Sequence, residues 1–318
     1  VQTCALPISL YERMPNVGNV IAAPFTHGRF DLTTRWQLGR ALRAHCYQNA
    51  YILPNSLKSA LPTFFAGIPN RIGFTGESRY GLINRRQKLD KHLLPRMVDR
   101  FLVLGPTGCT TLDADIPQLS AVPGAFERLR QTLGLTLHGK LAILCPGAEY
   151  GPAKRWPPRH FAALARRYAA QGWQVWLFGS QKDFSIAEEI NTLSDGLCIN
   201  LCGQTSLSEA IDLLACADTV VCNDSGLMHL AAALGRKLVA VYGSSSPDHT
   251  PPLSSRAQIV SLNLDCSPCF QRECPLGHTD CLNKLMPETV QQAAQALAAA
   301  EYSDGLSTFP NLKHNEEA

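Results

Sequence analysis

Short apolar runs alternate with amphipathic segments of helical length along most of the chain, and this alternation restricts the fold more than any other feature. In the second half, strands are predicted at 141–144, 174–178, 199–202, 219–222 and 238–242. The segments between them have helical spacing, at 159–171, 184–194, 206–215 and 227–234, and Ser206 with Glu209 forms a capping-box pattern. Because crossover helices connect parallel strands, this half predicts a doubly wound α/β domain.

The first half repeats the pattern with shorter elements. Strands are expected at 17–23, 50–53 and 71–74, and helices at 10–16, 33–45, 56–66, 94–104 and 125–133. The polar, basic stretch 76–91 predicts a surface loop, and the Gly-, Pro- and Thr-rich stretch 105–124 predicts a linker. We therefore expect an N-terminal Rossmann-like domain over 10–135 and a second one over 136–300, which ends in a helix at 288–300, followed by a disordered tail over 301–318.

Charge and apolar content narrow the class of protein. The 318 residues carry 29 Lys and Arg against 26 Asp and Glu, and the net charge of +3 is too weak to indicate nucleic-acid binding. No run of roughly 18 uncharged apolar residues is present, so no membrane span is expected, and no secretory signal precedes the first domain. Eight of the 12 cysteines are scattered, mostly along apolar segments, as free thiols of a cytosolic protein would be. We therefore expect a cytoplasmic protein.

The segment VVCNDSGLMHLAAAL, at 220–234, holds the clearest candidate site. A strand leads into Asp224, Ser225 and Gly226, and a helix begins at once. Unpaired N–H groups at a helix start attract anions, and a glycine lets a phosphate approach the backbone. His229, one turn into the helix, would add a donor, and Asp224 is better explained as a helix cap or an acceptor for sugar hydroxyls. A plain cap beside a core-facing histidine is the alternative, while a Ser-His hydrolase is weaker because no G-x-S-x-G motif surrounds Ser225.

Two further loops follow predicted strands. Residues 144–158, LCPGAEYGPAKRWPP, carry Glu149, Lys154 and Arg155, and Lys154 is the natural group to neutralise a diphosphate leaving group. Residues 177–183, LFGSQKD, place Asp183 where acidic residues commonly bind ribose hydroxyls. A solvated basic loop and a simple helix cap are the respective alternatives. Because ligands of doubly wound sheets bind outside the carboxyl ends of the strands, these loops are expected to share one site.

Four cysteines cluster in the segment CSPCFQRECPLGHTDC, at 266–281. They are Cys266, Cys269, Cys274 and Cys281, with His278 between the last two. A C-x-x-C pair followed by two more cysteines is compatible with a structural zinc site. The spacing is irregular for a zinc ribbon, so a redox-sensitive disulfide pair and unbridged thiols are the alternatives.

The segments PGAEYGPAKRWP, NDSGLMHLAAAL and YGSSSPDHTPPLS together resemble those of ADP-heptose:lipopolysaccharide heptosyltransferases. In the first half, LPNSLKSALPTFFAGIPNRIGF and ESRYGLIN are also similar to this family, and the likeness runs from about residue 10 to the last helix. The resemblance implies a GT-B fold, in which two Rossmann-like domains face each other across a cleft. It implies inverting transfer of a heptose from ADP-heptose to the first heptose of the lipopolysaccharide inner core, with no cofactor required. It leaves room for a peripheral contact with the inner membrane and gives no role to nucleic acid.

The same resemblance implies roles by position. Lys154 matches the lysine that neutralises the donor phosphates, and the donor-binding loop and helix start match Asp224, Ser225, Gly226 and His229. Further donor contacts are implied at Glu149 and Tyr150 for the phosphates, at Asp183 for the ribose and at Thr205 for the adenine pocket. In the N-terminal, acceptor-binding domain, the anionic acceptor would meet Lys58, Arg71 and Arg79. The alternative for each of the last three is a solvated surface charge.

The chain departs from the family at its N-terminus. Residues 1–9 show no periodicity and lack an initial Met, so they are interpreted as a non-native scar. The family begins with a strand, a loop that holds a catalytic aspartate, and a helix, and such a unit with its next strand needs roughly 30 residues. Nothing before Leu10 supplies it, so no general base is assigned. We expect the missing strand to expose a sheet edge, weaken folding and severely reduce transfer.

Two other functions stay open on the sequence. One is another GT-B glycosyltransferase with a different nucleotide sugar, since a fold alone does not fix a substrate. The other is a non-enzymatic, zinc-bearing nucleic-acid binder built from the cysteine cluster and the basic stretch 79–91. The weak net charge argues against the second, as does the lack of interleaved basic and aromatic residues.

Overall fold

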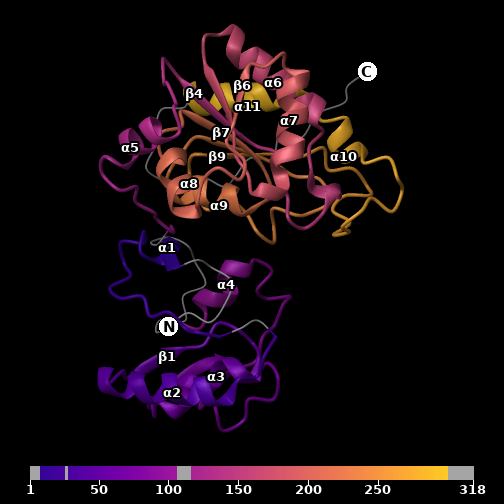
Figure 1. The fold of residues 1–318 in the computed structure, drawn as a ribbon. Coiled ribbons are helices and arrows are strands. Elements are labelled where there is room, and N and C mark those ends of the chain that lie inside the picture. Colours follow the sequence, from indigo (N-terminus) through magenta and orange to yellow (C-terminus); the bar gives the residue numbers. More distant parts are fainter. Residues whose placement is uncertain (1–7, 26–27, 106–115, 300–318) are drawn as a thin grey trace. The chain divides into compact units, whose positions relative to one another are not determined.

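The computed structural model of the chain describes residues 8–25, 28–105 and 116–299. Their contacts define two units (Figure 1). Unit 1 consists of Val1–Glu12, Asn16–Asp115 and Asp248–Thr250, and unit 2 of Arg13–Pro15, Ile116–Pro247 and Pro251–Ala318. Residues 116–135, assigned to the N-terminal domain on sequence, thus fall in unit 2. The expected tail at 301–318 and most of the expected scar at 1–9 lie outside the described residues.

Unit 1 contains a parallel sheet with the order β1-β2-β3, formed by Asn49–Tyr51, Asn70–Phe74 and Arg85–Gln87. Helices α2 (Leu32–Leu42) and α3 (Leu57–Phe65) pack against each other. They approach so closely that a Cβ on Gly39 would lie 2.5 Å from the Cβ of Phe65. The other described helical segments are α1 (Ile8–Tyr11), η1 (Arg43–His45) and α4 (Met97–Leu102). These elements confirm the predictions at 33–45, 50–53, 56–66 and 71–74.

Two predictions for unit 1 were wrong. The segment 17–23 forms no named strand, because Gly18 and Asn19 interrupt its short apolar run and disfavour extended pairing. Its Ile21 instead packs against an apolar cluster around Leu42. Conversely, β3 lies within the predicted loop. Its residues have no apolar alternation, but its backbone pairs with β2 as an edge strand, with Arg85 exposed.

Unit 2 is built on a parallel sheet with the order β6-β5-β4-β7-β8-β9 (Figure 1). In chain order the strands are β4 (Leu141–Cys145), β5 (Gln174–Leu177), β6 (Cys198–Asn200), β7 (Thr219–Asn223), β8 (Leu238–Val241) and β9 (Ala257–Val260). All but β9 match predicted strands. The four residues of β9 were missed because so short a run does not stand out from its irregular surroundings. This order, with the first strand in the middle, is that of a Rossmann domain.

Helices cover both faces of this sheet (Figure 1). One face carries α6 (Pro158–Ala170), α7 (Phe184–Leu193) and α11 (Pro287–Ala299), whose apolar side chains pack on alternate strand residues. The other carries α8 (Leu207–Leu214) and α9 (Gly226–Ala233). Shorter segments are α5 (Ala125–Thr132), η2 (Pro152–Lys154), η3 (Gln181–Asp183) and α10 (Asp280–Asn283).

The capping box predicted for α8 is confirmed: Glu209 N donates to Ser206 Oγ, and Ser206 N donates to the Glu209 carboxylate. No helix in the described ranges is long and apolar enough to cross a membrane.

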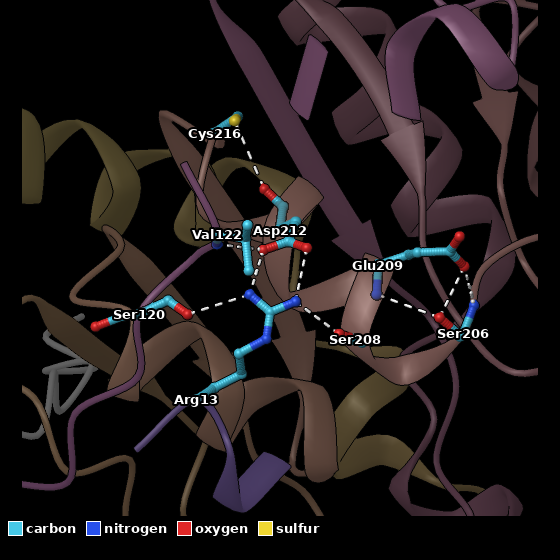
Figure 2. Close-up of polar contacts among 8 residues, drawn as sticks. All are labelled: Arg13, Ser120, Val122, Ser206, Ser208, Glu209, Asp212 and Cys216. Carbon is cyan, nitrogen blue, oxygen red and sulfur yellow. Dashed lines mark hydrogen bonds and ion pairs between the residues drawn. The ribbon is translucent and has the colours of Figure 1, made fainter. Parts of the chain in front are cut away.

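Asp212, on α8, holds two segments that are distant from it in sequence (Figure 2). Arg13 Nη1 and Nη2 donate to its two carboxylate oxygens at 2.7 and 2.8 Å, and Val122 N donates at 2.8 Å. Arg13 also donates to Ser208 Oγ and accepts from Ser120 N. The Arg13 and Asp212 side chains are only 12% and 5% exposed. We call these five residues the Arg13 clasp.

Candidate donor site at the edge of the second sheet

The loops predicted to bind a ligand leave the same edge of the unit 2 sheet. The strand order reverses between β4 and β7, because β5 and β6 lie beyond β4 whereas β8 and β9 lie beyond β7. Cys145, the last residue of β4, pairs with Cys222 of β7, so the loops that follow these strands start side by side. Ligands of doubly wound sheets bind in the crevice at such a reversal. The first loop carries Lys154 and the second carries Asp224.

Lys154 and Asp224 form an ion pair at this reversal. The Lys154 Nζ lies 2.5 Å from Asp224 Oδ2, and the two side chains are 18% and 6% exposed. Ser225, not Asp224, occupies the N-cap position of α9, so the predicted capping role of Asp224 was wrong. The pair removes the difficulty of an acidic residue in an anion site, because the ammonium neutralises the carboxylate.

Asn223 ties the two loops together, a role that the sequence analysis did not assign. Its Oδ1 accepts from Trp156 N at 3.0 Å, and its Nδ2 donates to Pro146 O at 2.7 Å. Asn223 and Trp156 are fully buried, and the indole Nε1 donates to Leu285 O at 2.9 Å. A polar residue that directly follows a buried strand was the one sequence signal for this role. The loop that presents Lys154 is therefore fixed at both ends.

The first turn of α9 lies beside the ion pair. Among the described residues, the buried Ser225 Oγ has no hydrogen-bond partner, and this side chain makes no capping bond. A Cβ on Gly226 would meet nothing within 4 Å, so the packing of the chain itself does not require glycine there. The helix start is thus open to a ligand, and its N–H groups suit an anion.

His229 is exposed, which excludes the core-facing histidine that the sequence analysis held as the alternative. The protein around the ring partly desolvates it even though one side is open, and this desolvation lowers the pKa of His229. The nearby Asp224 carboxylate opposes the shift, and the Lys154 ammonium adds to it. A lowered pKa keeps the imidazole neutral at pH 7, where it serves as a hydrogen-bonding group and not as a cation.

Glu149 and Tyr150 differ in how firmly they are held. Glu149 is exposed and pairs with Lys182 at 2.7 Å, a contact that lowers the pKa of the Glu149 carboxyl. The Tyr150 hydroxyl donates to Phe270 O at 2.7 Å, and the Lys154 Nζ stands 5.1 Å from the centre of the Tyr150 ring. Tyr150 therefore supports the lysine through its ring.

Asp183 precedes α7 without a side-chain capping bond, so the simple N-cap held as its alternative is not formed; its carboxylate instead completes a capping box with Ser180 at the start of η3. Its Oδ2 accepts from Ser180 N at 2.9 Å and from Ser180 Oγ at 2.8 Å. A Cβ on Gly147 would lie 2.5 Å from the Asp183 Cγ, so the loops after β4 and β5 touch at this point. Thr205 is half-buried in the loop after β6, on the same side of the order reversal as Asp183. A ribose contact by Asp183 and an adenine contact by Thr205 stay predictions.

The cations predicted to meet the acceptor, all in unit 1, are held in different ways. Arg79 is 1% exposed, and its guanidinium donates to Pro54 O at 2.7 Å and to Phe74 O. Arg71 is half-buried and donates to Leu82 O at 2.7 Å and to Ile68 O at 2.5 Å. Both arginines hold backbone carbonyls, and a contact of either one with the acceptor stays a prediction. Lys58, half-buried on the first turn of α3, makes no side-chain hydrogen bond or ion pair among the described residues.

The cysteine cluster borders one small cavity in unit 2. Cys266, Cys269, Cys274 and Cys281 all line it, and all are free thiols that are half-buried. In the described part of the chain, no three His, Cys, Asp or Glu side chains already stand in metal-binding geometry. The zinc site therefore stays a prediction, and the shared cavity is the observation that bears on it.

Parallel strands in both units, a Rossmann strand order in unit 2 and charged loops at its order reversal define an α/β protein, and its superposition on a solved heptosyltransferase assigns it to the GT-B fold class. Residues 35–280 match the family model for glycosyltransferase family 9 (heptosyltransferase). The chain therefore belongs to glycosyltransferase family 9 and is a glycosyltransferase, which leaves the non-enzymatic nucleic-acid reading without support.

Relatives of known name agree with this membership. The chain is 43% identical to lipopolysaccharide heptosyltransferase 2 of Escherichia coli (strain K12) over 303 residues, which is 92% of this chain and 87% of that one. It is 46% identical to lipooligosaccharide heptosyltransferase 2 of Haemophilus influenzae over 268 residues, with coverage of 80% and 76%. The solved structure of ADP-heptose LPS heptosyltransferase II from E. coli superposes with a TM-score of 0.78 at 41% identity, covering 91% of this chain and 86% of that chain.

Proposed function

We propose that this chain transfers a heptose from ADP-heptose to the first heptose of the lipopolysaccharide inner core, with inversion at the transferred carbon. The observation that carries the proposal is the Lys154–Asp224 pair at the order reversal of the unit 2 sheet, beside the open start of α9. Family membership and the names of the relatives support the same substrate pair.

The chemistry of such a transfer is mainly the handling of charge. As the bond to the sugar breaks, negative charge develops on the departing ADP, and fixed positive groups stabilise it. Lys154 supplies an ammonium held in place by Asp224, and the N–H groups at the start of α9 supply a second donor set. Gly226 leaves room for the diphosphate to approach them. Both sets of donors belong to the chain itself, so added Mg²⁺ is expected to leave the transfer rate unchanged.

Selective nucleotide binding is the first test. We expect calorimetric titration to show that ADP binds in preference to UDP and GDP, and that Lys154→Met and Asp224→Asn both weaken it. Lys140→Met is the matched control, because Lys140 is an exposed lysine at the opposite end of β4. Binding of UDP or GDP in place of ADP would instead favour the other GT-B reading, in which a different nucleotide sugar is the donor.

Transfer itself is the second test. Incubation with ADP-heptose and a heptose-terminated inner-core acceptor should extend the acceptor by one heptose, as read by mass spectrometry. Loss of one charge-stabilising group typically costs about 10²–10³ in rate, so Lys154→Met should fall by that factor while Lys140→Met does not. Equal rates for the two variants would show that Lys154 does not face the departing diphosphate.

If the acceptor is anchored in a membrane, the enzyme must act at the membrane surface. Unit 1 has a segment that could bind such a surface. The segment 80–93 exposes Tyr80 and Leu93, at 67% and 78%, and with them the cations Arg85, Arg86 and Lys88. Exposed apolar groups beside cations suit an anionic bilayer surface. Cosedimentation with phosphatidylglycerol vesicles, weakened by Arg86→Ala and absent with neutral vesicles, is the expected result. Binding to neither vesicle type would remove this part of the proposal.

A further inference from the structure

A segment of unit 2 has little regular structure and little apolar packing to hold it. Residues 266–279 form no helix or strand, and the short helix α10 begins only at Asp280. Two large apolar side chains in the segment, Phe270 and Leu276, are 51% and 61% exposed. A stretch of this length inside a compact domain needs some other restraint, because fixing each residue costs conformational entropy.

The four cysteines of this segment gather where such a restraint would act. One cavity, of about 20 Å³, is lined by Cys266, Cys269, Cys274 and Cys281. Its volume is close to that needed to hold a single water molecule or ion. The Cys274 sulfur already accepts the N–H of Thr279 at 3.4 Å, in a turn that Gly277 N closes on Cys274 O.

We propose that these four cysteines bind one structural Zn²⁺ ion. Zinc takes four thiolates in tetrahedral sites, and a C-x-x-C pair supplies two of them from one turn. Four thiolates complete a tetrahedral site, so His278, whose Nδ1 accepts the N–H of Asp280 at 2.9 Å, is not needed as a ligand. The sulfurs border the cavity without yet standing in metal-binding geometry among the described residues. Closure on the ion uses rotation about χ1, which moves a cysteine sulfur between staggered positions.

The segment that the ion would fix is bonded to the donor site. Between Cys269 and Cys274, the carbonyl of Phe270 accepts from the Tyr150 hydroxyl at 2.7 Å, and the carbonyl of Arg272 accepts from Ala153 N at 3.0 Å. A Cβ on Gly151 would lie 2.5 Å from that Arg272 oxygen, so the two segments are in close contact. The ion thus positions the loop that presents Lys154, a consequence that rests on the proposed function, whereas the metal site itself does not.

Measuring the zinc content of the purified chain tests whether the four cysteines bind the ion. Elemental analysis of the full chain purified in reducing buffer should give one zinc per chain, and Cys269→Ser and Cys274→Ser should each lose it. Cys46→Ser is the matched control, because Cys46 is an exposed free thiol in unit 1. If the variants fail to fold, titration of the unaltered chain with a mercurial should release one zinc per chain as its thiols react. No zinc, zinc that survives Cys274→Ser in a folded protein, iron in its place, or a disulfide among the four would each overturn the proposal.

ADP titration of the same preparation, before and after removal of zinc, tests the coupling. Energetic coupling between sites commonly amounts to about 5- to 150-fold in affinity, and we expect ADP binding to weaken within that range when zinc is removed. Equal ADP affinity with and without zinc would overturn the coupling and leave the metal site standing. A zinc-loaded, folded chain that never binds ADP would count against the proposed function instead.

Discussion

The replacement Asp212→Asn isolates the Arg13 clasp, because it keeps the size of the side chain and removes its charge. The carboxylate accepts from both Arg13 Nη atoms and from Val122 N, at 2.7, 2.8 and 2.8 Å. In the variant, the amide oxygen can still accept hydrogen bonds. The amide Nδ2, itself a donor, would point at an N–H donor of the Arg13 guanidinium. The Arg13 charge would then stay largely buried without a counter-charge, since its side chain is 12% exposed.

Removing one partner of a buried ion pair typically costs about 3–5 kcal/mol. We expect the lower end, about 3 kcal/mol, because the amide oxygen retains part of the hydrogen bonding. With an m-value of about 3 kcal/mol per molar urea, the unfolding midpoint should fall by about 1 M. Against a total stability of about 5–15 kcal/mol for a typical protein, that loss is large but leaves a folded chain to measure.

Urea unfolding followed by tryptophan fluorescence is the assay, because Trp156, Trp173 and Trp176 all belong to unit 2. The control is Glu127→Gln, the same kind of change at the exposed Glu127–Arg130 pair, whose contribution should be within about 1 kcal/mol. If Asp212→Asn lowered the midpoint no further than this control, the clasp would not be a significant source of unit 2 stability, and the reasoning would be refuted.

Three further changes test other features. Gly226→Ala should leave thermal unfolding unchanged, since its Cβ meets nothing, yet weaken ADP binding by about tenfold in calorimetric titration. Gly147→Ala should lower the urea midpoint by the equivalent of about 1–3 kcal/mol, because its Cβ would press on Asp183. Burial lowers the pKa of His160, so its stabilising contribution is full above the unfolded pKa of about 6.5 and is lost as pH falls through the folded value. The midpoint should therefore drop more between about pH 7.5 and 5 for the parent chain than for His160→Gln; parallel curves would exclude this.

Features that depend on nearby residues were the ones the sequence could predict. The capping box needs only Ser206 and Glu209, three positions apart, and both bonds formed as expected. The buried strands of unit 2 and the start of α9 follow from runs of apolar residues that end at polar turns. The resemblance then placed Lys154 and Asp224 among the donor-site residues, although a separate role was predicted for each of them.

Features that depend on distant parts of the chain could not be predicted in the same way. The pairing of Lys154 with Asp224 joins residues 70 positions apart, and only the order of the strands makes them neighbours. Arg79 was expected from the resemblance to meet the acceptor, but its side chain is buried and its guanidinium donates to the carbonyls of Pro54 and Phe74. β3 escaped notice because an edge strand can consist of charged residues, as at Arg85.

The Arg13 clasp has a consequence for synthesis on the ribosome. Arg13 and Asp212 are 199 positions apart, so at about 5–20 residues per second roughly 10–40 s separate their emergence. During that interval the Arg13 guanidinium cannot pair with the Asp212 carboxylate. Arg13–Pro15 can join unit 2 only after most of Ile116–Pro247 has been translated. Unit 1 is likewise incomplete until Asp248–Thr250 have been translated. The two units therefore cannot be completed strictly one after the other, and the last contacts of both form late in translation.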